Sequence, residues 1–196
     1  MITIAVIGRA SHGPADPVSD TTLAAAYEVG RGIGEAGAAL VSGGTSGVME
    51  AASRGARDVG GLTIGVLPGM DRGEANAFVD VALPTGLGTA RNLIYPRGCD
   101  AVVMVGGGAG TLNELTIAYQ AGTPVVIVGG SGGWADRIRS VLLEGRYLDE
   151  RRTVEIEFAA TGADAARRAF ELAEAAAGAP STRSDPTKRE THPPIR

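Results

Sequence analysis

The segment that decides the fold is residues 101–114, which read AVVMVGGGAGTLNE: five apolar residues, a run of glycines and the start of a helical pattern. Residues 39–50, ALVSGGTSGVME, repeat this arrangement. A strand that ends in glycines and turns directly into a helix directs backbone N–H groups and the positive end of the helix dipole at one point, where an anion can bind. Two such loops predict that the ligand is a phosphorylated small molecule.

Apolar runs of strand length alternate with amphipathic helical segments along the rest of the chain. Strands are predicted at 2–7, 39–42, 62–66, 79–83, 101–105, 124–128 and 154–158, and helices at 20–36, 46–59, 89–98, 111–121, 134–144 and 163–177. Near-continuous apolar strands separated by helices indicate a parallel sheet that is buried on both faces. We therefore expect an α/β fold, with a Rossmann-like, doubly wound, mainly parallel sheet of about seven strands and helices on both faces.

The composition predicts one domain followed by a tail. A chain of 196 residues with 44% hydrophobic content can bury a full core, so residues 1–178 are expected to form a single globular domain. After Gly178 the sequence is rich in Pro, Ser, Thr and charged residues and offers little to bury. Residues 179–196 are therefore expected to be a disordered tail.

Charge and residue counts limit the partners. The net charge is −4 and there is no basic stripe, so nucleic acid is not expected as a partner. No charged leader precedes the first strand and no apolar run approaches membrane-spanning length, which predicts a cytoplasmic protein without a membrane partner. The single cysteine, Cys99, is interpreted as a core residue, and one cysteine with two histidines predicts no metal site.

Several mechanisms require residues that this sequence lacks. The only lysine is Lys188, so no lysine of the core can form a Schiff base with pyridoxal phosphate. No Gly-Lys-Ser/Thr run is present for a Walker-type loop, and GRASHG at 8–13 lacks the GxGxxG spacing that a dinucleotide pyrophosphate needs. No cofactor is therefore expected, and a mononucleotide fits the loops better than a dinucleotide.

Four ordered segments resemble the LOG family. GGTSGVM at 43–49 is similar to its GGxxGLM segment, GGAGTLNE at 107–114 to its PGGxGTxxE segment and ARN at 90–92 to its short arginine motif, and IGVLP at 64–68 completes the order. The similarity extends from the first strand to about residue 128. It implies release of the base from cytokinin riboside 5′-monophosphates, which leaves ribose 5-phosphate. The family was formerly labelled lysine decarboxylases, a label that the lack of a core lysine independently argues against.

The sequence departs from the LOG pattern at two positions. Asn92 follows Arg91 where the family has lysine, and Gly106 replaces the proline before the second glycine run. Both changes resemble a neighbouring LOG-like branch to which the molybdenum cofactor carrier proteins are also similar. Two functional classes therefore stay open: a phosphoribohydrolase acting on an AMP-like nucleoside 5′-monophosphate, and a non-catalytic binder of a phosphorylated pterin or nucleotide.

The resemblance implies catalytic roles for Glu114 and Arg91. Cleavage of an N-glycosidic bond builds positive charge on the ribose, so a carboxylate there would stabilise the oxocarbenium-like state or orient the attacking water. Arg91, which is permanently charged, would position the substrate and stabilise the departing base. The phosphate is expected to be bound by Gly43, Gly44, Thr45 and Gly47 of the first loop and by Gly107, Gly108, Ala109, Gly110 and Thr111 of the second.

Each candidate also has an ordinary structural interpretation. Glycines after parallel strands often serve only tight turns and close packing, and a carboxylate such as Glu114 in a first helical turn commonly stabilises the helix dipole. Arg91 is also compatible with a solvated helix position, and His12 with an ordinary loop histidine. Glu50 follows the first loop as Glu114 follows the second, and packing or dipole pairing is its favoured interpretation.

A homodimer is implied by the same resemblance, because LOG-like proteins are generally dimers. The helices beside the glycine loops, at 46–59 and 111–121, would form an isologous interface. Their alanine-rich faces would allow close approach of two helices, but they could equally pack on the protein's own sheet.

Overall fold

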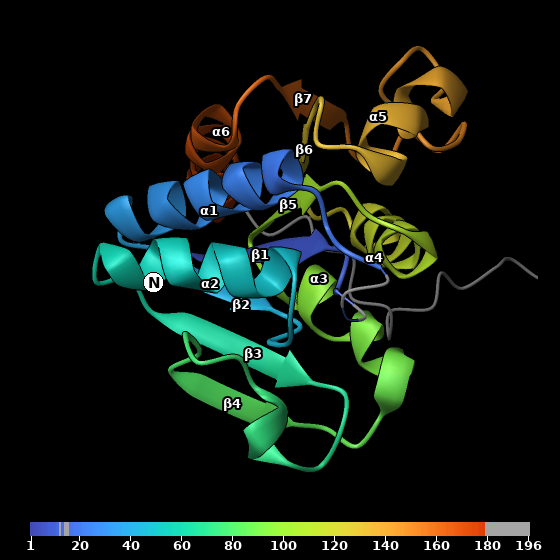
Figure 1. Cartoon of the computed structure of the whole chain (residues 1–196). Coiled ribbons are helices and arrows are strands. Elements are labelled where there is room, and N and C mark those ends of the chain that lie inside the picture. Colours follow the sequence, from blue (N-terminus) through green and yellow to red (C-terminus); the bar gives the residue numbers. More distant parts are fainter. Residues whose placement is uncertain (12, 14–15, 179–196) are drawn as a thin grey trace, which may run out of the picture.

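The computed structural model describes residues 1–11, 13 and 16–178, so the predictions for His12 and for the tail at 179–196 lie outside the described residues. Its centre is one sheet of seven parallel strands in the order β4-β3-β2-β1-β5-β6-β7 (Figure 1). The strands are β1 (Thr3–Gly8), β2 (Ala39–Ser42), β3 (Thr63–Leu67), β4 (Val81–Pro84), β5 (Ala101–Val105), β6 (Val125–Val128) and β7 (Ile156–Ala159). The predicted Rossmann-like α/β fold is confirmed.

Helices cover both faces of the sheet because the side chains of each strand alternate between two cores. Along β1, Ile4 and Val6 point into a core shared with α1 (Asp20–Glu35), α2 (Val48–Asp58) and α6 (Gly162–Gly178). Ala5 and Ile7 point into the other core, which is covered by α3 (Tyr95–Gly98), α4 (Ala109–Gln120) and α5 (Gly133–Arg137). Cys99 is buried in this second core, as expected.

Helices α1 and α2 cross at close range because glycines replace larger side chains at the contact. A Cβ atom on Gly30 would overlap the carbonyl oxygen of Ala52, and one on Gly55 would overlap that of Tyr27. The small-residue face of α2 therefore packs on α1 of the same chain, as Figure 1 shows for these two neighbouring helices. This face of α2 is thus occupied within the chain, and the dimer interface predicted for the helices at 46–59 and 111–121 stays a prediction.

Two predicted helices are shorter and more irregular than expected. The segment predicted at 89–98 is a 3₁₀ helix, η2 (Gly88–Leu93), followed by the single turn of α3. Pro96 lies in the first turn of α3, where a backbone N–H would have no partner within the helix, so its missing N–H costs nothing. The segment predicted at 134–144 is α5 followed by the 3₁₀ helix η3 (Ile138–Val141). It ends there because Leu142 is extended and Glu144 and Gly145 have positive φ angles.

The arrangement of the sheet places the functional loops. β1 pairs with β2 on one side and with β5 on the other, so the strand order reverses between β1 and β5. In such sheets ligands bind outside the carboxyl ends of the strands at this reversal. Both glycine loops, after β2 and β5, and the loop after β1 lie at that edge.

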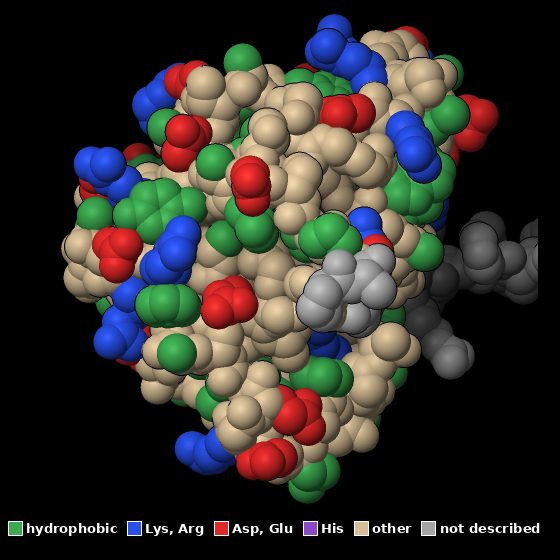
Figure 2. All heavy atoms as spheres, in the orientation of Figure 1, with side chains coloured by type: hydrophobic (Ala, Val, Ile, Leu, Met, Phe, Trp, Pro, Cys, Tyr) green, Lys and Arg blue, Asp and Glu red, His purple; other side chains and the backbone are tan. Residues whose placement is uncertain are grey.

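The exterior is mixed in charge on the side that carries α1 and α2. Figure 2 shows basic and acidic side chains interspersed over the described residues of this face, with no broad area of one sign. Within the described part of the chain, no helix is long and apolar enough to cross a membrane.

Candidate functional site

A cavity of about 460 Å³ opens at the carboxyl edge of the sheet, where the loops after β1, β2 and β5 meet η2 and α4. This volume is within the usual range for a small-molecule site. Seven of the predicted site residues line it: Thr45, Arg91, Gly108, Ala109, Gly110, Thr111 and Glu114. Its other walls include Arg9, Asp16, Met49, Pro68, Thr89 and Asn92. The main cavity, as we call it, therefore joins segments that are far apart in the sequence.

The second glycine loop divides into a packing part and a cavity part. Gly106 and Gly107 have φ angles of 60° and 107°, and their carbonyl groups accept hydrogen bonds from the N–H groups of Ala135 and Trp134. Gly108 is the N-cap of α4, and a Cβ atom there would meet nothing within 4 Å. Gly106 and Gly107 therefore shape the turn, whereas the residues from Gly108 onward line the main cavity.

The conformation of Gly106 explains one departure from the LOG pattern. Proline fixes φ near about −65°, so a φ angle of 60° is closed to it. The backbone N–H of Gly106, which proline lacks, also donates a hydrogen bond of 2.8 Å to Ser131 Oγ. The loop path seen in this protein thus requires the glycine.

The first glycine loop contributes mainly close backbone packing. Gly44 has a φ angle of 72°, and a Cβ atom there would be 2.8 Å from Gly65 Cα. Gly47 is the N-cap of α2 with a φ angle of 68°, and a Cβ atom there would be 2.5 Å from the carbonyl oxygen of Arg9. Only Thr45 of the predicted residues in this loop lines the main cavity.

Arg91 reaches from η2 to the end of β3. Its Nη1 donates a hydrogen bond of 3.1 Å to the carbonyl oxygen of Val66, and its Cζ lies 5.7 Å from the centre of the Tyr95 ring. Its Nε is buried and has no hydrogen-bond partner among the described residues. The guanidinium group is therefore held in place at the wall of the main cavity.

Glu114 is a buried carboxylate with only 5% of its surface exposed. The hydroxyl group of Tyr95 donates a hydrogen bond to its Oε1. Burial raises the pKa of Glu114 from 4.5 to about 7. The hydrogen bond from Tyr95 and the charge of Arg91 both lower this pKa, but their effect is smaller than that of burial. A carboxylate that titrates near neutral pH in a cavity marks a candidate functional site.

Tyr95 and Asn92 were not predicted as site residues. Tyr95 is 3% exposed, and burial raises its pKa well above the ordinary value, so it remains a neutral donor. Asn92 is also buried and lines the main cavity, and its Nδ2 donates to Oδ1 of Asn113 at 3.4 Å. Neither partnership has a signal in the sequence, because both join α4 to a segment that lies about twenty residues earlier.

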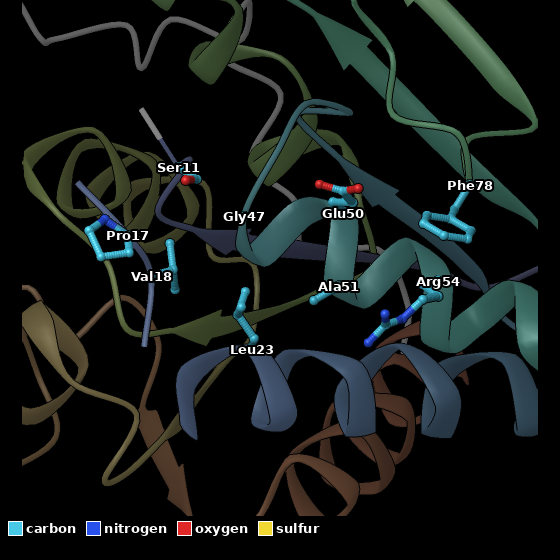
Figure 3. A pocket seen from close by; sticks show the side chains of 9 residues that line it. All are labelled: Ser11, Pro17, Val18, Leu23, Gly47, Glu50, Ala51, Arg54 and Phe78. Carbon is cyan, nitrogen blue, oxygen red and sulfur yellow. The ribbon is translucent and has the colours of Figure 1, made fainter. Parts of the chain in front are cut away.

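A second cavity, of about 330 Å³, is lined by Gly47 and by residues of the segment after β1, of α1 and of α2 (Figure 3). Pro17, Val18, Leu23, Ala51 and Phe78 give it apolar walls, and Glu50 and Arg54 face it from α2. Glu50 is thus not part of the main cavity. Among the described residues no cluster of His, Cys, Asp and Glu could hold a metal ion.

The fold and the main cavity define a LOG-like protein. The model of the SLOG cluster4 family matches residues 1–163, and the chain belongs to this family. An uncharacterized protein of Archaeoglobus fulgidus is 40% identical over 136 residues, which cover 66% of this chain and 85% of that protein.

Two further relatives have functional names. The cytokinin riboside 5′-monophosphate phosphoribohydrolase of Mycobacterium tuberculosis is 36% identical over 123 residues, which cover 58% of this chain and 66% of that protein. The solved structure of the molybdenum cofactor carrier protein of Chlamydomonas reinhardtii has a TM-score of 0.69 and 35% identity, and the match covers 87% of this chain and 97% of that one. The predicted family is confirmed, and both predicted functional classes occur among its relatives.

Proposed function

We propose that this protein binds a nucleoside 5′-monophosphate in the main cavity and hydrolyses its N-glycosidic bond, which yields the free base and ribose 5-phosphate. One observation carries the proposal: the buried carboxylate of Glu114 lines the same cavity as the N-terminus of α4. An anion site needs no carboxylate, and a buried carboxylate beside it would weaken simple phosphate binding. The presence of the Glu114 carboxylate is better explained if it stabilises the positive charge that develops on the ribose as the N-glycosidic bond breaks.

The phosphate binds at the first turn of α4. The N–H groups of Gly108, Ala109, Gly110 and Thr111 lie at the start of the helix, where they have no partner within the helix and meet the positive end of its dipole. The Thr111 hydroxyl adds a donor, and Thr45 of the first loop lines the same cavity. The phosphate thus fixes the ribose near Glu114, which is one helical turn further along.

Hydrolysis then proceeds at the anomeric carbon. The oxygen of a water molecule bonds to this carbon as the N-glycosidic bond breaks, the bond's electron pair leaves with the base, and a proton from the water ends on the base. Charged Glu114 stabilises the oxocarbenium-like state between these events. Arg91 orients the substrate and stabilises negative charge on the departing base.

A second candidate is a non-catalytic carrier of a phosphorylated pterin or nucleotide. It is favoured by the similarity to the molybdenum cofactor carrier protein over 87% of the chain and by the positive φ angle of Gly106, which excludes the proline of the LOG motif. A carrier would use the same first turn of α4 for the phosphate. It would leave Glu114 and Arg91 without a catalytic task.

The deciding experiment incubates the protein with a panel of purine and pyrimidine nucleoside 5′-monophosphates and detects the free base by chromatography. Release of one base with equimolar ribose 5-phosphate supports the hydrolase. Binding of the monophosphates without release of any base supports the carrier.

We also propose that the protein is a homodimer, as the LOG resemblance implies. Leu93 and Ile94 are 53% and 44% exposed on the segment beside α4, where exposed aliphatic side chains favour an interface.

A further inference from the structure

Arg91, Tyr95 and Glu114 form a connected set that links η2, α3 and α4. Arg91 lies over the ring of Tyr95, with its Cζ 5.7 Å from the ring centre, and the Tyr95 hydroxyl donates to Oε1 of Glu114. Tyr95 is 3% exposed and lies outside the lining of the main cavity, whereas Arg91 and Glu114 line it. Tyr95 therefore contacts Arg91 and Glu114 from the interior of the protein and not from the main cavity.

The direction of this hydrogen bond is fixed by chemistry. Burial keeps Tyr95 neutral, since it raises the pKa of the phenol well above its ordinary value, and a charged carboxylate can only accept. The hydrogen bond therefore favours the charged form of Glu114. It occupies Oε1, and within the described part of the chain Oε2 accepts no hydrogen bond, so this second oxygen is available to a ligand.

We propose that Tyr95 is a positioning residue for Glu114: it holds Oε1, keeps the carboxylate charged and leaves Oε2 to face the anomeric carbon of the substrate. The inference rests on the proposed hydrolysis for its catalytic meaning. The effect of Tyr95 on the charge of Glu114 can be tested even if the protein does not catalyse this hydrolysis.

The other groups around Glu114 define what Tyr95 contributes. Burial opposes the charge of Glu114, and Arg91 from η2 and Tyr95 from α3 favour it, which together set its pKa at about 7. Arg9 and Asp16, from the segment after β1, line the same cavity as an ion pair with each other. Without the Tyr95 hydroxyl, Arg91 alone opposes burial, so the pKa of Glu114 should rise.

The first experiment compares the pH profile of kcat/KM for base release by the wild type and by Tyr95→Phe, which keeps the ring and its contact with Arg91. The acid limb should move to higher pH, and activity should recover towards the wild-type level as the pH is raised. KM should change little, because the phosphate is bound by α4. A uniform loss at every pH, with no shift of the acid limb, would mean that Tyr95 has only a packing role.

A matched control is Tyr119→Phe. Tyr119 is also buried, but its hydroxyl lies 3.4 Å from Asp149 and not at Glu114. This variant should leave the acid limb where it is in the wild type. An equal shift in both variants would overturn the proposal, because it would trace the effect to general loosening of the core.

The second experiment needs no catalysis. The protein is labelled with ¹³C at the glutamate carboxyl carbons, the Glu114 signal is identified by its loss in Glu114→Gln, and its titration is followed in the wild type and in Tyr95→Phe. The midpoint should be higher in Tyr95→Phe. An unchanged midpoint overturns the coupling, whereas a shifted midpoint in a protein that releases no base keeps the coupling and refutes only the hydrolase.

Fluorotyrosine keeps the hydroxyl group of Tyr95 and should shift the titration midpoint of Glu114 in the direction opposite to Tyr95→Phe. Incorporation of 3-fluorotyrosine makes the phenol more acidic and the hydrogen bond from Tyr95 stronger, so the midpoint of Glu114 should fall. The fluorinated protein covers the case in which Tyr95→Phe fails to fold. A midpoint that rises or does not move would contradict the proposed direction of donation.

Discussion

Gly43 lies against the guanidinium group of Arg91: a Cβ atom on Gly43 would overlap Nη1 and lie 2.6 Å from Cζ. The first glycine loop and the arginine motif, 48 residues apart in the sequence, are therefore fitted to each other. The absence of a side chain at 43 lets Arg91 reach Val66 and remain at the wall of the main cavity. Gly43 thus leaves room for Arg91 and is not itself among the residues that line the main cavity.

Gly43→Ala should displace Arg91 without unfolding the protein, because the added methyl group meets the far end of a flexible side chain and not backbone. We expect AMP to bind about tenfold more weakly, in line with the loss of one hydrogen bond to a charged group. Calorimetric titration measures this. Gly98→Ala is the control, since a Cβ atom there meets nothing within 4 Å, and its affinity should equal that of the wild type.

Gly108→Val should block the phosphate at the start of α4. Gly108 has an ordinary φ angle of −108° and open space at its Cβ position, so valine adds bulk in the main cavity without strain in the backbone. We expect affinity for both AMP and inorganic phosphate to fall by about tenfold or more, with Gly108→Ala intermediate. Unchanged affinity in a folded Gly108→Val protein would place the phosphate elsewhere.

The fold was predictable because it depends on local patterns, whereas parts of the site depend on contacts between distant segments. Seven apolar runs in the sequence predicted the seven strands. The pattern of the second glycine loop predicted that Gly108–Thr111 and Glu114 lie close together at the start of one helix. The prediction that Gly43, Gly44 and Gly47 bind phosphate stays a prediction, and in the structure these residues meet Arg91, Gly65 and Arg9. No sequence pattern could place Tyr95 behind Glu114, because this depends on how α3 docks on α4.

Glu114 should make the stability of the protein depend on pH. The native state keeps its proton up to about pH 7, whereas an unfolded chain loses it near 4.5, so the native state binds more protons between these values. The free energy of unfolding should therefore fall as the pH rises through this window, by up to about 3 kcal/mol. Urea denaturation at several pH values measures it.

Glu114→Gln is the comparison for this measurement, because it removes the titrating group and keeps the shape. The variant should be more stable than the wild type above pH 7, and the difference should shrink as the pH falls towards 4.5. Parallel stability curves for the two proteins would contradict the raised pKa of Glu114.

A dimer that uses the segment beside α4 should be sensitive to charge at Leu93. Leu93→Glu places a carboxylate in the proposed apolar interface, so the mass in light scattering at micromolar concentration should shift from dimer towards monomer. Val141→Glu, at a residue that is 66% exposed on η3, should leave the mass unchanged. A monomeric wild type would refute the dimer.

Glu114→Gln and Arg91→Ala together separate a hydrolase from a carrier. In a hydrolase, Glu114→Gln keeps phosphate affinity but loses the charge that stabilises the oxocarbenium-like state, so turnover should fall by about a hundredfold or more. Arg91→Ala should lower turnover and also weaken binding, because the guanidinium group contacts charge in the ground state and in the transition state alike.

A carrier predicts a different pattern in the same three proteins. The wild type releases no base, and Glu114→Gln binds anions as well as before or more tightly, because a repelling carboxylate has been removed. Base release and affinity for AMP are therefore measured side by side on the wild type and both variants. Base release by the wild type that Glu114→Gln abolishes at unchanged affinity identifies the hydrolase, and no release from any monophosphate leaves the carrier as the function of this site.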